Sequence, residues 1–89
     1  FEWDKHNINK NWEKHNVAPV ESEQLFFNNP LLIAPDITHS QAEIRYYALG
    51  RTNRDRKLFI AFTIKKSKIR VISSRDMSKK ERAEYEKYT

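Results

Sequence analysis

The stretch "EIRYYALGRTNRDRKLFIAFTIKKSKIRVISSR", residues 43–75, decides the fold. It contains three runs rich in β-branched and aromatic residues, separated by the short polar segments "RTNRDR" and "KKSK". Short polar connections between such runs are typical of antiparallel hairpins. The stretch therefore predicts three consecutive antiparallel strands. The middle run, "KLFIAFTIK", is apolar on both faces, which is the pattern of a central strand.

The residues before this stretch predict two helices and one more strand. Asp4 is placed to cap a helix through about His15, with Ile8 and Trp12 on its core face, and Asn16 fits a left-handed position at its end. A second, short helix is expected from Pro19, with Val20, Leu25 and Phe26 or Phe27 on its apolar side, and "FNNP" ends it. The run "LLIAPDI" predicts a strand at the edge of the sheet, because Pro35 cannot donate a ladder hydrogen bond.

The residues after the stretch predict a last helix. Ser78 and Glu81 form a capping-box pattern, and Ala83, Tyr85 and Tyr88 are its candidate contacts in a loosely docked helix. The predicted fold is therefore α+β: two N-terminal helices, an antiparallel sheet of about four strands and one C-terminal helix, with the helices gathered on one side. We expect residues 1–89 to form a single domain.

Composition excludes some classes and favours others. The chain has no Cys, its longest apolar run is far too short to cross a bilayer, and no signal-peptide pattern is present, so we expect a cytoplasmic protein. Residues 45–89 contain 14 Lys and Arg against 5 Asp and Glu, whereas residues 1–44 contain 3 against 7. This basic half is typical of proteins that bind a polyanion, although a solvated charged surface has the same composition.

The predicted strands place basic and aromatic residues on one face. If the helices cover the face of Leu58, Ile60 and Phe62, the opposite face carries the residues Arg45, Tyr47, Thr63, Lys65 and Arg70. Guanidinium groups bind phosphates, and aromatic rings stack on unpaired bases, so this mixture favours RNA. A tyrosine on a sheet is also a common packing residue, and that alternative remains open.

The sequence resembles the BrnT family, the toxin half of a bacterial type II toxin-antitoxin pair. The resemblance rests on "FEWD" at the start, Asn11, Lys14-His15, "FNNP", Asp36, His39-Ser40, Glu43-x-Arg45, "ALG" at 48–50, "IRVISSR", and Glu81-Arg82 with Tyr85. Asn16 replaces a usual Gly, and Ser74 stands where Ala is common. The resemblance implies a RelE-like fold and a ribonuclease that arrests translation.

Cleavage through attack by a ribose 2′-hydroxyl needs a base, positive charge for the transition state and an acid. Arg70, Arg75 and Arg45 are the candidates for the phosphate, and His39 and Glu43 are the candidates for proton transfer. The alternatives are that Glu43 pairs with an arginine and that His39 caps a turn. No metal or other cofactor is expected, because the acidic residues are scattered along the chain.

The charged hairpin loop has two interpretations. Its residues Arg51, Arg54 and Arg56 either steer RNA by charge or keep the loop solvated. We include Arg51 with Tyr47, Thr63 and Lys65 among the predicted RNA-binding residues.

Arg70 and Arg75 raise a geometric problem. Their odd separation puts them on opposite faces of a regular strand, which would bury the Arg75 guanidinium under the helices at high cost. We therefore predict that the strand ends or bulges at Ser73 and Ser74, so that Arg75 reaches the rim beside Arg70.

The resemblance also implies a partner. A BrnA-like antitoxin of the ribbon-helix-helix class is expected to neutralise the toxin in a two-plus-two heterotetramer, and DNA would be contacted only through the antitoxin. No membrane partner is expected. The alternative is a non-catalytic RNA-binding or protein-interaction module with a basic sheet face.

Overall fold

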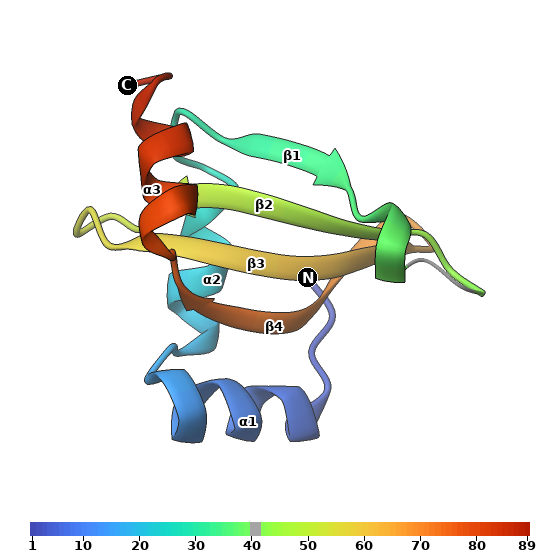
Figure 1. Ribbon diagram of the computed structural model, residues 1–89. Coiled ribbons are helices and arrows are strands. Elements are labelled where there is room, and N and C mark those ends of the chain that lie inside the picture. The colour runs from blue at the N-terminus through green and yellow to red at the C-terminus, as the bar shows by residue number, and fades with distance from the viewer. Residues whose placement is uncertain (40–41) are drawn as a thin grey trace.

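The computed structural model describes residues 1–39 and 42–89. Ser40, which belongs to the His39-Ser40 pair of the resemblance, lies outside the described residues. The elements are α1 (Lys5–His15), α2 (Pro19–Leu25), β1 (Leu32–Pro35), the 3-10 turn η1 (Ile37–His39), β2 (Arg45–Arg51), β3 (Lys57–Lys65), β4 (Lys68–Asp76) and α3 (Lys79–Glu86). The strands form one antiparallel sheet in the order β1-β2-β3-β4 (Figure 1). The predicted α+β fold is confirmed.

The helix ends follow the predicted capping chemistry. The Asp4 side chain accepts a hydrogen bond from the N–H of His6, and Asn16 adopts φ 53° where α1 ends. Pro19 opens α2. Ser78 accepts from the N–H of Glu81, whose side chain in turn accepts from the N–H of Ser78, so the predicted capping box is formed. Local sequence is therefore sufficient to start and stop these helices.

One face of the sheet packs against the N-terminal helices. The core on this face consists of the buried residues Val17, Leu25, Ala48, Leu58, Ile60, Phe62 and Val71. Gly50 permits the close approach of α2, because a Cβ atom at that position would lie 2.9 Å from Cγ of Leu25. The expectation that Trp12 and Val20 belong to the core is wrong, since they are 55% and 58% exposed.

The third helix lies on the opposite face, which contradicts the expectation that all helices gather on one side. Figure 1 shows α2 behind the sheet and α3 in front of it, across one end of the strands. Tyr85 is fully buried against Leu49 and Met77, and its hydroxyl donates to the carbonyl of Pro30 at 2.6 Å. This anchor fixes α3 more firmly than its polar sequence indicated, whereas Ala83, a predicted contact, is exposed.

The β4 strand contains the predicted bulge, one position earlier than expected. Ser73 pairs with Ala61 and Val71 pairs with Phe62, so Ile72 is the extra residue. Val71 and Ser74 both lie on the helix-covered face and are fully buried. Because two residues separate them instead of one, every side chain after the bulge changes face.

Buried hydrogen bonds hold Ser74 in this position. Its hydroxyl lies 2.7 Å from that of Ser22, and its N–H donates to Oδ1 of Asn11 at 3.2 Å. The N-terminal segment continues this coverage of the β4 edge, since the N–H of Glu2 donates to the carbonyl of Ile69. The N-terminal residues thus protect an edge strand that would otherwise expose unpaired backbone groups.

Arg56 has a structural role that neither interpretation of the hairpin loop foresaw. Its guanidinium donates to the carbonyls of His15 and Asn16, to Glu21 and to both carboxylate oxygens of Asp76. The hydrogen bonds that Arg56 donates to Asp76 and Glu21 raise the pKa of Arg56 above its ordinary value. One side chain therefore ties the end of α1, the start of α2 and the end of β4 together.

Candidate functional site

The face of the sheet opposite the N-terminal helices is covered by α3 at one end only, and we call it the open face. At its other end, a row of three residues crosses three strands. In the sheet register Arg45 of β2 lies opposite Thr63 of β3, and Thr63 lies opposite Arg70 of β4. Neighbouring strands are about 4.8 Å apart, so the two arginine Cα atoms are separated by roughly 10 Å. Thr63 is 7% exposed and forms the floor between them. Two long guanidinium side chains thus flank a small hydroxyl on a rigid sheet.

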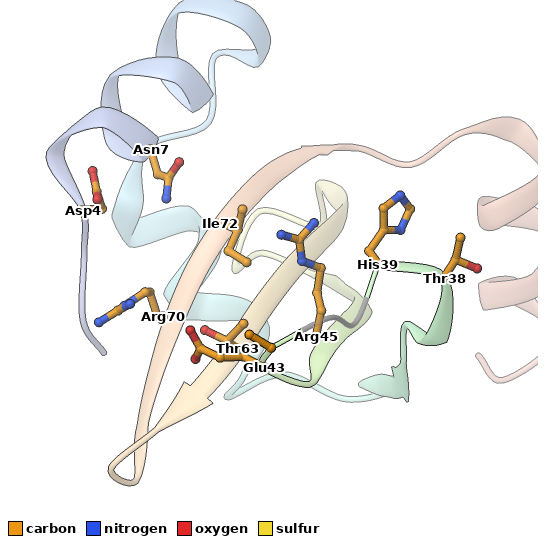
Figure 2. Close-up of a pocket in the computed structure, with 10 residues that line it drawn as sticks. Asp4, Asn7, Thr38, His39, Glu43, Arg45, Thr63, Arg70 and Ile72 are labelled. Carbon is orange, nitrogen blue, oxygen red and sulfur yellow. The ribbon is translucent and has the colours of Figure 1, made fainter.

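This row lines a cavity of about 490 Å³ (Figure 2). The cavity is also lined by Asp4 and Asn7 from the start of α1, by Thr38 and His39 from η1, and by Ala42, Glu43 and Ile72. Five of the predicted site residues therefore meet in one place, although they come from segments far apart in the sequence: His39, Glu43, Arg45, Thr63 and Arg70.

Glu2 already pairs with Arg70. Its Oε1 accepts a hydrogen bond from Nη2 of Arg70 at 2.6 Å, and both side chains are partly exposed. The hydrogen bond and the charge of Glu2 raise the pKa of Arg70 above its ordinary value, with a smaller contribution from the charge of Glu43. The same contact lowers the pKa of Glu2. In this structure the Arg70 guanidinium therefore binds the carboxylate of Glu2.

His39 is held by Asp36. Its Nδ1 atom lies 2.8 Å from Oδ2 of Asp36, three residues earlier, and the imidazole is 62% exposed. When Nδ1 carries the proton and donates it to Asp36, Nε2 keeps its lone pair and can accept a proton. The N–H of Asp36 also donates to the carbonyl of Arg45 at 2.6 Å. Asp36 thus connects η1 to the strand that carries Arg45.

Sequence reasoning did not select Asp36 or Glu2 for the site. The spacing of Asp36 and His39 contains the signal, because residues three apart in one helical turn face each other. For Glu2 the sequence offers no such signal, since its partner is 68 residues away and is reached only through the pairing of the N-terminal segment with β4.

Arg75 lies on the same face as Arg70 but at the other end of it. It is opposite Phe59, and Phe59 is four residues from Thr63 along β3, which corresponds to roughly 13 Å. Its guanidinium forms two hydrogen bonds with Glu81 and lies 4.1 Å from the centre of the Phe59 ring. The bulge thus brings Arg75 to the predicted face without bringing it into the Arg70 cavity.

Apart from Thr63, the predicted RNA-binding residues lie outside the arginine cavity, as Arg75 does. Tyr47 is two positions from Arg45 on the same face, and its ring stacks on Phe59 with centres 5.8 Å apart. Arg51 donates to the carbonyl of Asn29 beside α3. Lys65 is exposed at the β3–β4 turn, opposite Lys68.

Within residues 1–39 and 42–89, no group of three or more His, Asp or Glu side chains is arranged to hold a metal ion. None of the helices in this part of the chain is both long and apolar enough to cross a membrane.

The family comparison matches nearly the whole chain. Residues 3–81 match the model of the BrnT family, described as the ribonuclease toxin of a type II toxin-antitoxin system. The chain belongs to the BrnT family. This family consists of ribonuclease toxins, and a type II system implies an antitoxin as the partner. The match includes every described residue that lines the arginine cavity, whereas Glu2, the partner of Arg70, lies just outside it. A search of curated proteins found no match.

Proposed function

We propose that this BrnT chain is a metal-independent endoribonuclease that cleaves RNA in the cavity formed by Arg45, Thr63 and Arg70. The observation that carries the proposal is the row that these residues form across three strands, beside His39 and Glu43. Guanidinium groups keep their charge at any physiological pH and offer several donors in a fixed plane. Two of them, on β2 and β4 on either side of Thr63, suit a phosphate whose negative charge increases in the transition state.

The proposed reaction is attack of a ribose 2′-hydroxyl on the adjacent phosphate. The hydroxyl loses its proton to a base, the new O–P bond forms, and the bond to the 5′ oxygen breaks as an acid protonates it. The orientation of His39 by Asp36 leaves Nε2 available for one of these transfers, and we assign the other to Glu43. The products are a 2′,3′-cyclic phosphate and a free 5′-hydroxyl.

Glu2 is expected to leave Arg70 when RNA binds. Its carboxylate occupies one donor direction of the guanidinium, and a phosphate competes for the same charge. Because the pair is partly exposed, water and salt screen it, and little free energy is needed to separate Glu2 from Arg70. Arg75 has a different role in this proposal. It packs against α3, and it contributes to RNA cleavage only by attracting RNA through its charge.

The proposal includes the cellular consequence. Cleavage of RNA arrests translation, and a BrnA-like antitoxin of the ribbon-helix-helix class neutralises the toxin in a two-plus-two complex. The basic face supports this assignment, because an acidic or apolar antitoxin segment placed across it would exclude RNA.

The test is the chemistry of the products. Purified protein is incubated with a labelled single-stranded RNA in EDTA, and the ends of the fragments are analysed. Cleavage to cyclic phosphates, and resistance of a fully 2′-O-methylated RNA, are the expected results. Arg45→Ala should lose most of the activity, whereas Lys14→Ala, an exposed charge on α1, serves as the control. RNA that binds but is never cut, with or without ribosomes, would establish the non-catalytic alternative.

A further inference from the structure

A second depression lies on the open face, between β1 and the end of α3. It has a volume of about 370 Å³, and Tyr47, Leu49, Ala34, Glu84 and Tyr88 are among the residues that line it. In Figure 1 the C-terminal end of α3 lies beside β1 at this edge of the sheet. The depression and the arginine cavity therefore share strand β2.

Two tyrosines from different elements line this depression, which we call the slot. Tyr47 belongs to β2, and its ring stacks on Phe59. Tyr88 follows α3 and is 62% exposed. Ala34 lies directly opposite Tyr47 in the β1–β2 register, so a methyl group occupies a position where most side chains would fill the space. Leu49, 3% exposed, gives the slot an apolar floor.

The slot is close to the arginine row. Tyr47 and Arg45 are two residues apart on one strand face, which corresponds to roughly 7 Å. An RNA strand with a phosphate at Arg45 therefore brings a neighbouring base to Tyr47 without crossing any other element. Among residues 1–39 and 42–89, those that line the arginine cavity include His39 but no Phe, Tyr or Trp, and the slot supplies tyrosine rings beside it.

We propose that the slot binds an unpaired nucleobase next to the phosphate held by Arg45, between the rings of Tyr47 and Tyr88. Flat apolar walls suit the faces of a base, since each base has a π-face whatever its identity. The proposal rests on RNA being the substrate of the arginine cavity and adds the part of the site that selects the cleavage position.

Glu84 gives the slot a preference for guanine. It is exposed and lines the same depression as Tyr88. A carboxylate only accepts hydrogen bonds, and guanine offers two parallel donors, N1–H and the N2 amino group. Adenine, cytosine and uracil do not present two adjacent donors on that edge. Specific RNA recognition commonly uses such contacts to the edges of unstacked bases.

The first test measures RNA affinity by fluorescence anisotropy. The probe is a labelled heptauridylate in which the central residue is guanosine and every ribose is 2′-O-methylated to prevent cleavage. Tyr88→Ala should weaken binding about tenfold, the effect of losing one stacked base. Tyr88→Phe keeps the ring and should bind like the wild type. Phe27→Ala removes an aromatic side chain that is 79% exposed next to α2, on the other side of the sheet, and is the control.

The second test measures base preference. The wild type should bind the guanosine probe more tightly than the all-uridine probe, and Glu84→Gln should reduce that ratio to about one without weakening the all-uridine complex. Equal affinity of Tyr88→Ala and the wild type for the guanosine probe overturns the slot. A guanosine preference that survives Glu84→Gln overturns the role of Glu84.

These outcomes are separable from those for the cleavage reaction. If Tyr88→Ala binds and cuts RNA like the wild type while Arg45→Ala does not cut, the slot is wrong and the ribonuclease proposal stands. If the wild type never cuts RNA but Tyr88→Ala weakens binding, the slot stands without catalysis. If Tyr88→Ala disrupts only self-association or the complex with an antitoxin, the depression is a protein interface and the proposal is overturned.

Discussion

The two ends of the open sheet face each present an arginine of β4 with a carboxylate partner. Arg70 and Arg75 are almost equally exposed, at 33% and 34% of the side chain. Their partners differ. Glu2 is 41% exposed and accepts one hydrogen bond from Arg70, whereas Glu81 is 23% exposed and accepts two from Arg75. Exposure therefore does not distinguish a group available to a ligand from a group committed to the fold, but its contacts do.

Arg75 has further contacts that hold its side chain in the fold. Its guanidinium lies over the Phe59 ring, and Nη1 also donates to the carbonyl of Asp76. Glu81 belongs at the same time to the capping box of α3. Removing Arg75 therefore disturbs a helix start and an aromatic contact together, whereas removing Arg70 disturbs one partly exposed ion pair.

The largest expected effect is on cleavage. Arg70→Ala should reduce the rate of RNA cleavage by about 10²–10³-fold, the usual loss when one charged donor to a transition state is removed. Arg75→Ala should change the rate by less than about tenfold, because only long-range charge is lost. The measurement is the initial rate on one labelled RNA, with circular dichroism to check folding. Equal losses for both variants would show that the two ends form one site.

The second effect is on stability and has the opposite order. Arg75→Ala should lower the free energy of unfolding by about 1–2 kcal/mol, which combines a charged hydrogen-bonded pair, discounted for solvent screening, with a cation–π contact. Urea denaturation measures it. Arg75→Lys is the matched variant: it keeps the charge, loses the bidentate fork and should recover only part of the loss. A larger loss for Arg70→Ala would reverse the comparison.

The third effect depends on pH. The hydrogen bonds from Arg75 hold the pKa of Glu81 below its ordinary 4.5. The ionised Glu81 therefore stabilises the fold fully at pH values above its pKa in the unfolded chain. This stabilisation is lost as the pH falls through its lower pKa in the folded protein. Between pH 6 and pH 3 the wild type should lose more stability than Glu81→Gln. A variant that shows the same acid dependence as the wild type would contradict the assignment.

The smallest effect concerns Glu2. Glu2→Gln removes the carboxylate that competes for Arg70, so RNA affinity should rise about two- to fivefold at low salt and less at high salt. Glu81→Gln is the comparison at the other end, and its RNA affinity should rise less, because Arg75 acts on RNA only through long-range charge. An affinity that falls in Glu2→Gln would mean that Glu2 positions Arg70 for RNA instead of competing with it.

Much of the fold was predictable because its signals are local. Runs of β-branched and aromatic residues between short polar segments marked β2, β3 and β4, and single residues marked the helix ends: Asp4, Asn16 and Ser78. The side of the sheet that α3 covers was not predictable. Its sequence is polar and its anchor is one tyrosine, whose hydroxyl partner is the carbonyl of Pro30 in a distant loop.

The candidate site was half predictable for a related reason. Arg45, Thr63 and Arg70 were expected on one face, because the pairing of β2 with β3 is regular and Arg70 lies before the bulge in β4. His39 and Glu43 were proposed from their chemistry, and the path of the chain after β1 brings them to the same cavity. Asp36 and Glu2 were not proposed, because their importance lies in their partners.

The sequence by itself determined the helix ends, the strands, the basic face and, through its motifs, the BrnT family. Only the tertiary structure decided which of the two arginines, Arg70 or Arg75, has few contacts within the protein. The bulge at Ile72 turns Arg75 toward α3, and the buried hydrogen bonds of Ser74 with Ser22 and Asn11 fix this geometry. The physical reason is that a face is set by periodicity within a strand, whereas a partner is set by contacts between residues far apart in the chain.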